Sequence, residues 1–126
     1  MPTLSPMLSV RRGAQAVAFY EAAFGATVIF RIDDDASGEV VAQLSIAGAE
    51  FWVADESPQH QNFSPGTLNG STTRMVLTVD DPQAVFDRAI AAGATEVWPV
   101  ANRHGWLIGR VADPYGHHWE IGKPSA

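Results

Sequence analysis

The sequence predicts an α+β fold that is built from two copies of one βαβββ unit. The first observation is an internal repeat, in which residues 15–30 (QAVAFYEAAFGATVIF) align without gaps on residues 83–98 (QAVFDRAIAAGATEVW). Seven of the 16 aligned positions are identical, which indicates a duplicated unit. The second observation is that each copy has apolar residues at helical spacing, ends in glycine and continues into a β-branched run. The third is that a short alternating strand precedes each copy.

The first half contains one expected helix and four expected strands. Val17, Tyr20 and Phe24 recur at helical spacing, and Gly25 then ends the helix because glycine adopts a left-handed cap at little steric cost. Residues 33–38 (DDDASG) carry the residue types that turns favour. The strands are expected over residues 6–10, 27–32, 40–46 and 50–54.

The second half repeats this order after a polar connection. Val85, Phe86, Ala89 and Ile90 mark its helix, and Gly93 ends it. The strands are expected over residues 75–79, 95–97, 106–111 and 117–122, with a turn over 113–116. Residues 55–73 are rich in Gly, Pro, Ser and Asn and are expected to form a linker or a mobile flap. We therefore expect a single domain over residues 1–126, with halves at about 4–54 and 74–123.

Composition narrows the classes of partner. The 126 residues are 46% hydrophobic and 17% charged, which is typical of a globular domain. The net charge of −6 argues against nucleic acid and anionic membranes as partners, and it is compatible with a cationic or neutral ligand. The absence of cysteine excludes thiolate metal sites and cysteine nucleophiles. No signal peptide or membrane-spanning run is visible, so a cytoplasmic protein is expected.

Two segments carry a resemblance to a known family. The repeat, together with FYEAAFGA (19–26) and GRVADPYGHHWEIG (109–122), resembles the vicinal oxygen chelate superfamily, and most closely the PhnB-like branch of its glyoxalase/bleomycin-resistance group. The resemblance extends from about Leu4 to Lys123. It implies a strongly curved, eight-stranded mixed sheet, split into two modules around a cleft, with the helices outside. It also implies a homodimer in many members, sometimes with cleft walls shared between chains.

Strand alternation predicts which side chains face this cleft. Residues that alternate with the apolar, helix-facing positions of the first, fourth, fifth and eighth strands belong to the cleft side. This small-molecule site is expected to contain Ser5, Met7, Ser9, Glu50, Trp52, Arg74, Val76, Thr78, His118 and Glu120.

The resemblance also implies four metal-ligand positions, which in this sequence are Ser5, Trp52, Arg74 and Glu120. Only Glu120 is an ordinary ligand, since arginine stays protonated and the indole of tryptophan offers no lone pair. His118 could add a second ligand, but two are too few unless His60 or Glu50 joins them. We therefore expect no metal and no other cofactor.

Two functions remain open at this stage. The first is a metal-independent protein that sequesters a bulky, aromatic natural product or antibiotic, with Trp52 stacking on a planar ligand. Alternatively, Trp52 fills a collapsed cleft. The second is a lyase, isomerase or dioxygenase-like enzyme in which Glu120 is the general base and Arg74 or His118 steadies an oxyanion.

Three further expectations concern residues around the cleft. Glu120 and Arg74 form either a clamp for the ligand or a structural ion pair. Trp98 and Trp106 lie either near a dimer interface or at the mouth of the cleft. A homodimer with a two-fold axis is expected, because pairing would cover sheet edges and apolar surface.

Overall fold

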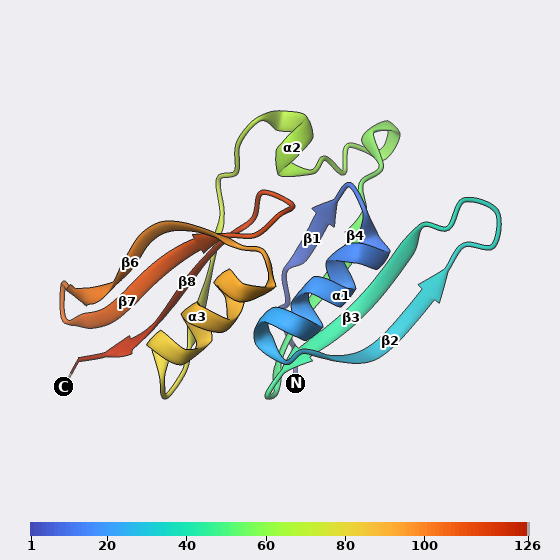
Figure 1. Ribbon diagram of the computed structural model, residues 1–126. Helices are drawn as coiled ribbons and strands as arrows, with labels where there is room; N and C mark the ends of the chain where they lie inside the picture. Colours follow the sequence, from blue (N-terminus) through green and yellow to red (C-terminus); the bar gives the residue numbers. More distant parts are fainter. Residues whose placement is uncertain (126) are drawn as a thin grey trace.

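The computed structural model describes residues 1–125 as two βαβββ modules that lie side by side (Figure 1). The N-terminal module forms a four-stranded mixed sheet in the order β1-β4-β3-β2. Its elements are β1 (Met7–Val10), α1 (Gly13–Phe24), β2 (Thr27–Asp33), β3 (Val40–Ile46) and β4 (Ala49–Asp55).

The C-terminal module repeats this plan, with the strand order β5-β8-β7-β6. Its elements are β5 (Arg74–Thr78), α3 (Pro82–Ala92), β6 (Thr95–Arg103), β7 (Trp106–Ala112) and β8 (His118–Pro124). In each module the first and last strands are parallel neighbours, and the remaining pairs are antiparallel. The predicted α+β fold of two βαβββ modules is thereby confirmed.

The eight strands are hydrogen-bonded as two separate sheets, so the curved eight-stranded sheet is not continuous within the chain. β1 pairs with β4 and β5 pairs with β8, and the described strands contain no β1–β5 pairing. The connection between the modules also holds more structure than a linker. It contains the 3₁₀ turn η1 (Pro58–His60) and the short helix α2 (Pro65–Leu68), which lie at the top of Figure 1.

Burial along the strands follows the predicted alternation. In β4, Phe51 and Val53 are buried, whereas Glu50 is exposed. In β8, Trp119 and Ile121 are buried, whereas Glu120 remains partly exposed. Each sheet therefore packs one face against a helix and leaves the other face open. The predicted cleft residues of β1, β4, β5 and β8 belong to these open faces.

The two modules pack together through their helices and through one buried carboxylate. The guanidinium of Arg88 in α3 donates through Nε to the carbonyl oxygen of Ala22 in α1, at 2.8 Å. The Tyr20 hydroxyl of α1 donates to Oδ2 of Asp113 at 2.5 Å, and the indole N–H of Trp119 donates to the same oxygen at 3.0 Å. Burial and the neighbouring Asp113 charge raise the pKa of Tyr20 well above its usual value.

The helix ends follow the sequence signals. Gly25 adopts a left-handed conformation (φ 67°), and its N–H bonds back to the last turn of α1. The start of α3 has a cap that the sequence analysis did not identify, in which the side chain of Asp81 accepts from the N–H of Ala84. Within residues 1–125, no helix combines the length and the apolar character required to cross a membrane.

Candidate functional site

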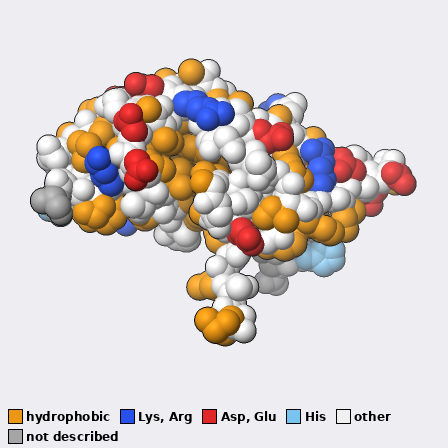
Figure 2. Space-filling view, turned by 90° about the horizontal axis from the view of Figure 1, so that it is seen from below, with side chains coloured by type: hydrophobic (Ala, Val, Ile, Leu, Met, Phe, Trp, Pro, Cys, Tyr) orange, Lys and Arg blue, Asp and Glu red, His pale blue; other side chains and the backbone are white. Residues whose placement is uncertain are grey.

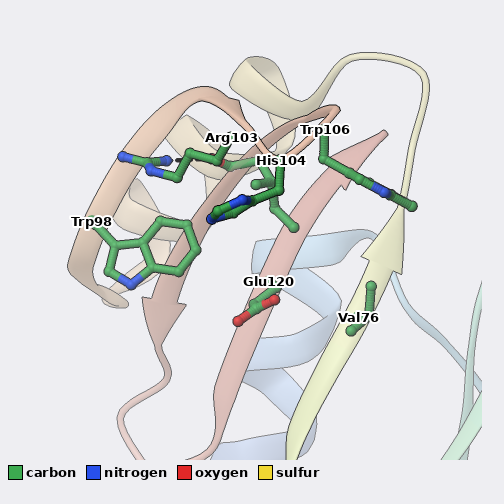
Figure 3. Close-up of a pocket in the computed structure, with 7 residues that line it drawn as sticks. Val76, Trp98, Arg103, His104, Trp106 and Glu120 are labelled. Atoms are coloured by element: carbon green, nitrogen blue, oxygen red, sulfur yellow. Dashed lines mark hydrogen bonds between the residues drawn. The ribbon is translucent and has the colours of Figure 1, made fainter. Parts of the chain in front are cut away.

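A cavity of about 410 Å³ lies over the open face of the C-terminal sheet. Figure 3 shows Glu120 projecting from β8 into this cavity, with Trp98 on one side and Trp106 and Val76 on the other. We call this cavity the C-terminal pocket. It is lined by Val76, Trp98, Arg103, His104, Trp106, Ile108 and Glu120.

The hairpin between β6 and β7 forms one rim of the pocket. Arg103 and Trp106 are paired across the hairpin, and the two residues between them both have positive φ, at 50° for His104 and 82° for Gly105. Two consecutive positive φ values are typical of the tight turns that match the twist of a hairpin. This turn holds His104 between Trp98 and Trp106 in the view of Figure 3.

An irregularity in β6 determines where Arg103 and Trp98 lie. Pro99 has no N–H to donate, and the pairing of β6 with β7 shifts register between Trp98 and Ala101. The guanidinium of Arg103 donates through Nη1 to the carbonyls of Pro99 and Ile108, both at 2.7 Å. Its Cζ atom lies 4.5 Å from the centre of the Trp98 ring, a cation–π contact. The bulge is therefore stabilised by the guanidinium that borders the pocket.

Glu120 lies at the centre of an ion-pair network. It faces Arg110 of β7 on one side and Val76 of β5 on the other. Arg110 donates to Oε2 through Nε at 3.1 Å and through Nη2 at 2.5 Å. Nε of Arg74 lies 3.0 Å from the same oxygen. The Cζ atom of Arg110 also lies 5.1 Å from the centre of the Trp98 ring. Arg110 therefore contacts both the carboxylate of Glu120 and the aromatic side of the pocket.

The structure brings together only part of the predicted cleft. Val76 and Glu120 line the C-terminal pocket, and Arg74 is connected to it through Glu120. Arg74 and Glu50 also line a cavity of about 360 Å³ between the modules. Met7 lines a third cavity, of about 660 Å³, beneath the connection between the modules.

Trp52 lies away from Glu120, on the open face of the N-terminal sheet. Its nearest aromatic neighbour is Phe30, with ring centres 5.9 Å apart. Trp52 and Glu120 occupy matching positions of the two repeats, but each belongs to its own sheet. Within one chain, the aromatic walls of the pocket that contains Glu120 are therefore Trp98 and Trp106.

The remaining predicted residues lie outside the C-terminal pocket. Ser5, Ser9 and Thr78 line none of these three cavities. The Ser9 carbonyl contacts Nε2 of His117 at 2.9 Å, while the backbone N–H of His117 donates to Asp113 in the turn before β8. The Nδ1 atom of His118 is buried and has no hydrogen-bond partner among the described residues.

Sequence reasoning missed Arg103, His104, Ile108 and Arg110, and left Trp98 and Trp106 unassigned. The alternation of Trp106, Ile108 and Arg110 could have placed them on one face of β7. The position of Arg110 opposite Glu120 depends on the turn, which extends one residue further than predicted because His117 also bonds to Asp113. The expected strand over 95–97 was too short, since β6 continues past Pro99 to Arg103.

The donor set does not fit a divalent metal. No group of three or more His, Asp or Glu side chains in residues 1–125 converges on one point. At the four ligand positions that the resemblance implied, Arg74 forms an ion pair with Glu120, and Trp52 packs near Phe30. A hydroxyl at Ser5 and one carboxylate already bound by two guanidinium groups cannot replace the three or four ligands of a typical site.

Comparisons with known proteins agree with the repeat and the fold. The model of the Glyoxalase/Bleomycin resistance protein/Dioxygenase superfamily matches residues 4–121. An uncharacterized Mycobacterium bovis protein, Mb0911c, is 39% identical over 98% of this chain and 84% of its own length. The crystal structure of TioX from Micromonospora sp. ML1 has a TM-score of 0.75 at 24% identity, covering 98% of this chain and 99% of TioX.

A third similar protein is the fosfomycin resistance protein FosX from Listeria monocytogenes. Its structure has a TM-score of 0.74 at 16% identity and covers 98% of this chain and 93% of FosX. At such identities the likeness of TioX and FosX concerns the fold. The match of the family model over nearly the whole chain is more specific, and this chain belongs to the Glyoxalase/Bleomycin resistance protein/Dioxygenase superfamily.

Proposed function

We propose that this protein is a metal-independent small-molecule-binding protein that sequesters a bulky, partly aromatic natural product or antibiotic. The observation that carries the proposal is that Glu120 is ion-paired with two arginines. Its carboxylate is held by Arg74 and Arg110, in a donor set that lacks the ligands for a metal. The position that would otherwise serve metal chemistry instead contributes a polar floor to a pocket.

The walls of this pocket suit a ligand with a planar apolar part. Trp98 and Trp106 offer large flat surfaces, and Val76 and Ile108 add aliphatic ones. Aromatic stacking contributes roughly 0.5–1.5 kcal/mol beyond the burial of apolar area. A cavity of about 410 Å³ is within the range of small-molecule sites. Sequestration requires affinity alone, so it needs no catalytic group.

Family membership is consistent with a resistance role, without fixing it. FosX is named as a fosfomycin resistance protein, and it shares this fold. A fold supports many functions, so the likeness only adds to the case made by the pocket. The segments FYEAAFGA and GRVADPYGHHWEIG favour a place within the PhnB-like branch of the superfamily.

We also propose a homodimer that covers the open face of the N-terminal sheet. Met7, Phe30 and Ile32 expose 53%, 43% and 57% of their surface, although they are large apolar side chains. A partner that covered them would remove this apolar surface from water, which is the usual driving force for stable association. If the covering surface were the C-terminal pocket of a second copy, Trp52 would join the binding site.

An enzymatic function is the alternative, and one observation favours it. The hydrogen bonds from Arg110 and the nearest contact of Arg74 all reach Oε2 of Glu120, while Oε1 accepts no hydrogen bond within residues 1–125. Because Glu120 lines the pocket, Oε1 could take a proton from a bound substrate. In that case Glu120→Gln would abolish turnover, whereas under sequestration it would weaken binding only modestly because the amide keeps an acceptor.

The deciding experiment combines a binding titration with recovery of the compound. Bleomycin, mitomycin C and an anthraquinone would be titrated against the wild type, Trp98→Ala and Glu120→Gln, with mass spectrometry of the recovered compound. Sequestration predicts an unchanged compound and a loss of about 2 kcal/mol of binding free energy in Trp98→Ala. Phe63→Ala, which removes a partly exposed aromatic outside the pocket, is the matched control. A converted product that disappears in Glu120→Gln would overturn sequestration.

A further inference from the structure

The surroundings of the C-terminal pocket carry a charge opposite to that of the whole chain. Arg103 lines the pocket, and Arg74 and Arg110 contact its floor residue. Glu120 is the only carboxylate among the lining residues. The group formed by Arg103, Glu120 and the two arginines bound to Glu120 therefore holds three positive charges and one negative charge, in a chain with a net charge of −6.

Such a local reversal is possible because the charges of this protein are interspersed. On the face shown in Figure 2, lysine and arginine groups alternate with acidic groups and hydrophobic side chains. Charges separated by more than about 8–10 Å of salt solution are largely screened from one another. A bound ligand therefore experiences the groups it touches much more strongly than the net charge of the chain.

Among the three arginines, Arg103 is the one whose positive charge is not paired with a carboxylate of residues 1–125. Its Nη1 atom donates to two backbone carbonyls, which are neutral and leave the positive charge in place. Its Nε and Nη2 atoms make no hydrogen bond with residues 1–125, and no carboxylate forms a salt bridge with it in that range. The guanidinium is thus fixed beside the Trp98 ring with N–H groups that remain free to bind a ligand.

We propose that the ligand of the C-terminal pocket is an aromatic anion, in which a planar ring system carries a carboxylate or phosphate group. This inference rests on the proposed binding function and names its ligand class. The ring lies against Trp98 or Trp106, and the anionic group accepts hydrogen bonds from the free N–H groups of Arg103. Guanidinium groups suit carboxylate and phosphate oxygens in particular, because their planar N–H groups match the geometry of these anions.

The test uses probes of one shape and three charges. Isothermal titration calorimetry would compare 2-naphthoate, neutral 2-naphthamide and cationic 2-naphthylmethylammonium on the wild-type protein. We expect 2-naphthoate to bind about five-fold or more tightly than 2-naphthamide, and the cation to bind most weakly. The preference should shrink as salt is raised, since an ionic contact is screened. A fourth probe, 2-naphthyl phosphate, distinguishes a phosphate ligand from a carboxylate ligand.

Variants connect the preference to particular arginines. Arg103→Gln should reduce the ratio of naphthoate to naphthamide affinity towards one, and Arg103→Lys should restore part of it. Arg74→Gln removes a positive charge from a side chain that is 57% exposed, so it provides a second variant if the β6 bulge fails to form in Arg103→Gln. Arg12→Gln is the matched control, because Arg12 is exposed and outside the pocket, and within residues 1–125 its side chain donates only to Gln15, at 3.4 Å.

The outcomes separate the two proposals. Equal binding of the three probes, or preference for the cation, would overturn the anionic ligand class and leave the binding function standing. A preference for naphthoate that persists in both Arg103→Gln and Arg74→Gln would overturn the assignment to these arginines. If none of the naphthalene probes bound the folded wild type, the aromatic anion and the aromatic binding function would both fail.

Discussion

Arg110 of β7 directs two N–H groups at one oxygen of Glu120 on the neighbouring strand β8, with Nε at 3.1 Å and Nη2 at 2.5 Å from Oε2. The side chains of Arg110 and Glu120 are 22% and 13% exposed, whereas that of Arg74 is 57% exposed. The two arginines therefore contact the same carboxylate, but Arg74 is much more exposed to water than Arg110. Because water screens the more exposed contact, their contributions to stability should differ.

Arg110→Ala should lower the free energy of unfolding by about 1–3 kcal/mol, since it leaves a largely buried carboxylate with one exposed partner. Arg74→Ala should lower it by less than about 1 kcal/mol, the usual range of an exposed ion pair. Urea denaturation at neutral pH measures both. The double variant Arg110→Ala/Glu120→Ala should cost less than the sum of its single changes, because each alone leaves a charge without its partner. Equal costs for the two arginine variants would contradict this ranking.

The protein purified without chelator should contain no stoichiometric divalent transition metal. Three of the four positions that the superfamily resemblance implies as ligands are serine, tryptophan and arginine, and Glu120 is occupied by ion pairs. EDTA should accordingly leave the melting temperature unchanged, since no ligand that stabilises the native state would be removed. Elemental analysis with about one Ni, Zn, Mn or Fe per chain would contradict the prediction.

Trp52 provides a test of how the binding site is assembled. Within one chain Trp52 does not line the pocket of Glu120, so Trp52→Ala should leave ligand affinity unchanged if the protein is a monomer. If a second copy covers the pocket with its N-terminal sheet, Trp52→Ala should weaken binding by about 1–2 kcal/mol. Titration of the same ligand against the wild type, Trp52→Ala and Trp98→Ala distinguishes the two arrangements.

The assembly itself is measured by sedimentation. We expect a dimer at micromolar concentration, and we expect Phe30→Asp to dissociate it because the change introduces a charge into exposed apolar surface. Ala18→Asp is the matched control, because it adds the same charge to an exposed position of α1, on the other side of the N-terminal sheet, and should leave the dimer intact. A wild type that sediments as a monomer would contradict both the dimer and a binding site that two copies share.

Local patterns determined most of the fold, and this explains what could be predicted. The repeat of residues 15–30 at 83–98 fixed the number of modules, and alternation in β4 and β8 placed Phe51, Val53, Trp119 and Ile121 on the helix side. These features depend on neighbours within one strand or helix. Whether Trp52 and Glu120 share a cleft depends on how two sheets are placed in space, and strand periodicity carries no information on that.

The parts of the site that escaped prediction depend on irregular backbone. Arg110 reaches Glu120 because the turn after β7 includes His117, whose N–H bonds to the buried carboxylate of Asp113. Arg103 lies beside Trp98 because the β6 bulge at Pro99 offers it a carbonyl oxygen. In both cases a side chain stabilises a local departure from regular pairing, and the site residues follow from that departure.

The contact between Tyr20 and Asp113 predicts a loss of stability in alkaline solution. Burial, together with the charge of Asp113, raises the pKa of the Tyr20 phenol in the folded state. The folded state therefore holds this proton more tightly than the unfolded state, in which tyrosine titrates near about pH 10. The contribution to stability is complete below that pH and falls as the pH rises from about 10 towards the folded pKa.

Thermal unfolding of the wild type and Tyr20→Phe between neutral and strongly alkaline pH tests this relationship. Tyr20→Phe should lower the free energy of unfolding by about 1–3 kcal/mol at neutral pH, because buried Asp113 loses one of its hydrogen-bond donors. The difference between the two proteins should then narrow as the pH rises above about 10. Tyr115, whose pKa is raised less strongly, should leave a smaller alkaline dependence in Tyr20→Phe. A difference that stays constant with pH would show that the phenol proton is not held more tightly in the folded state.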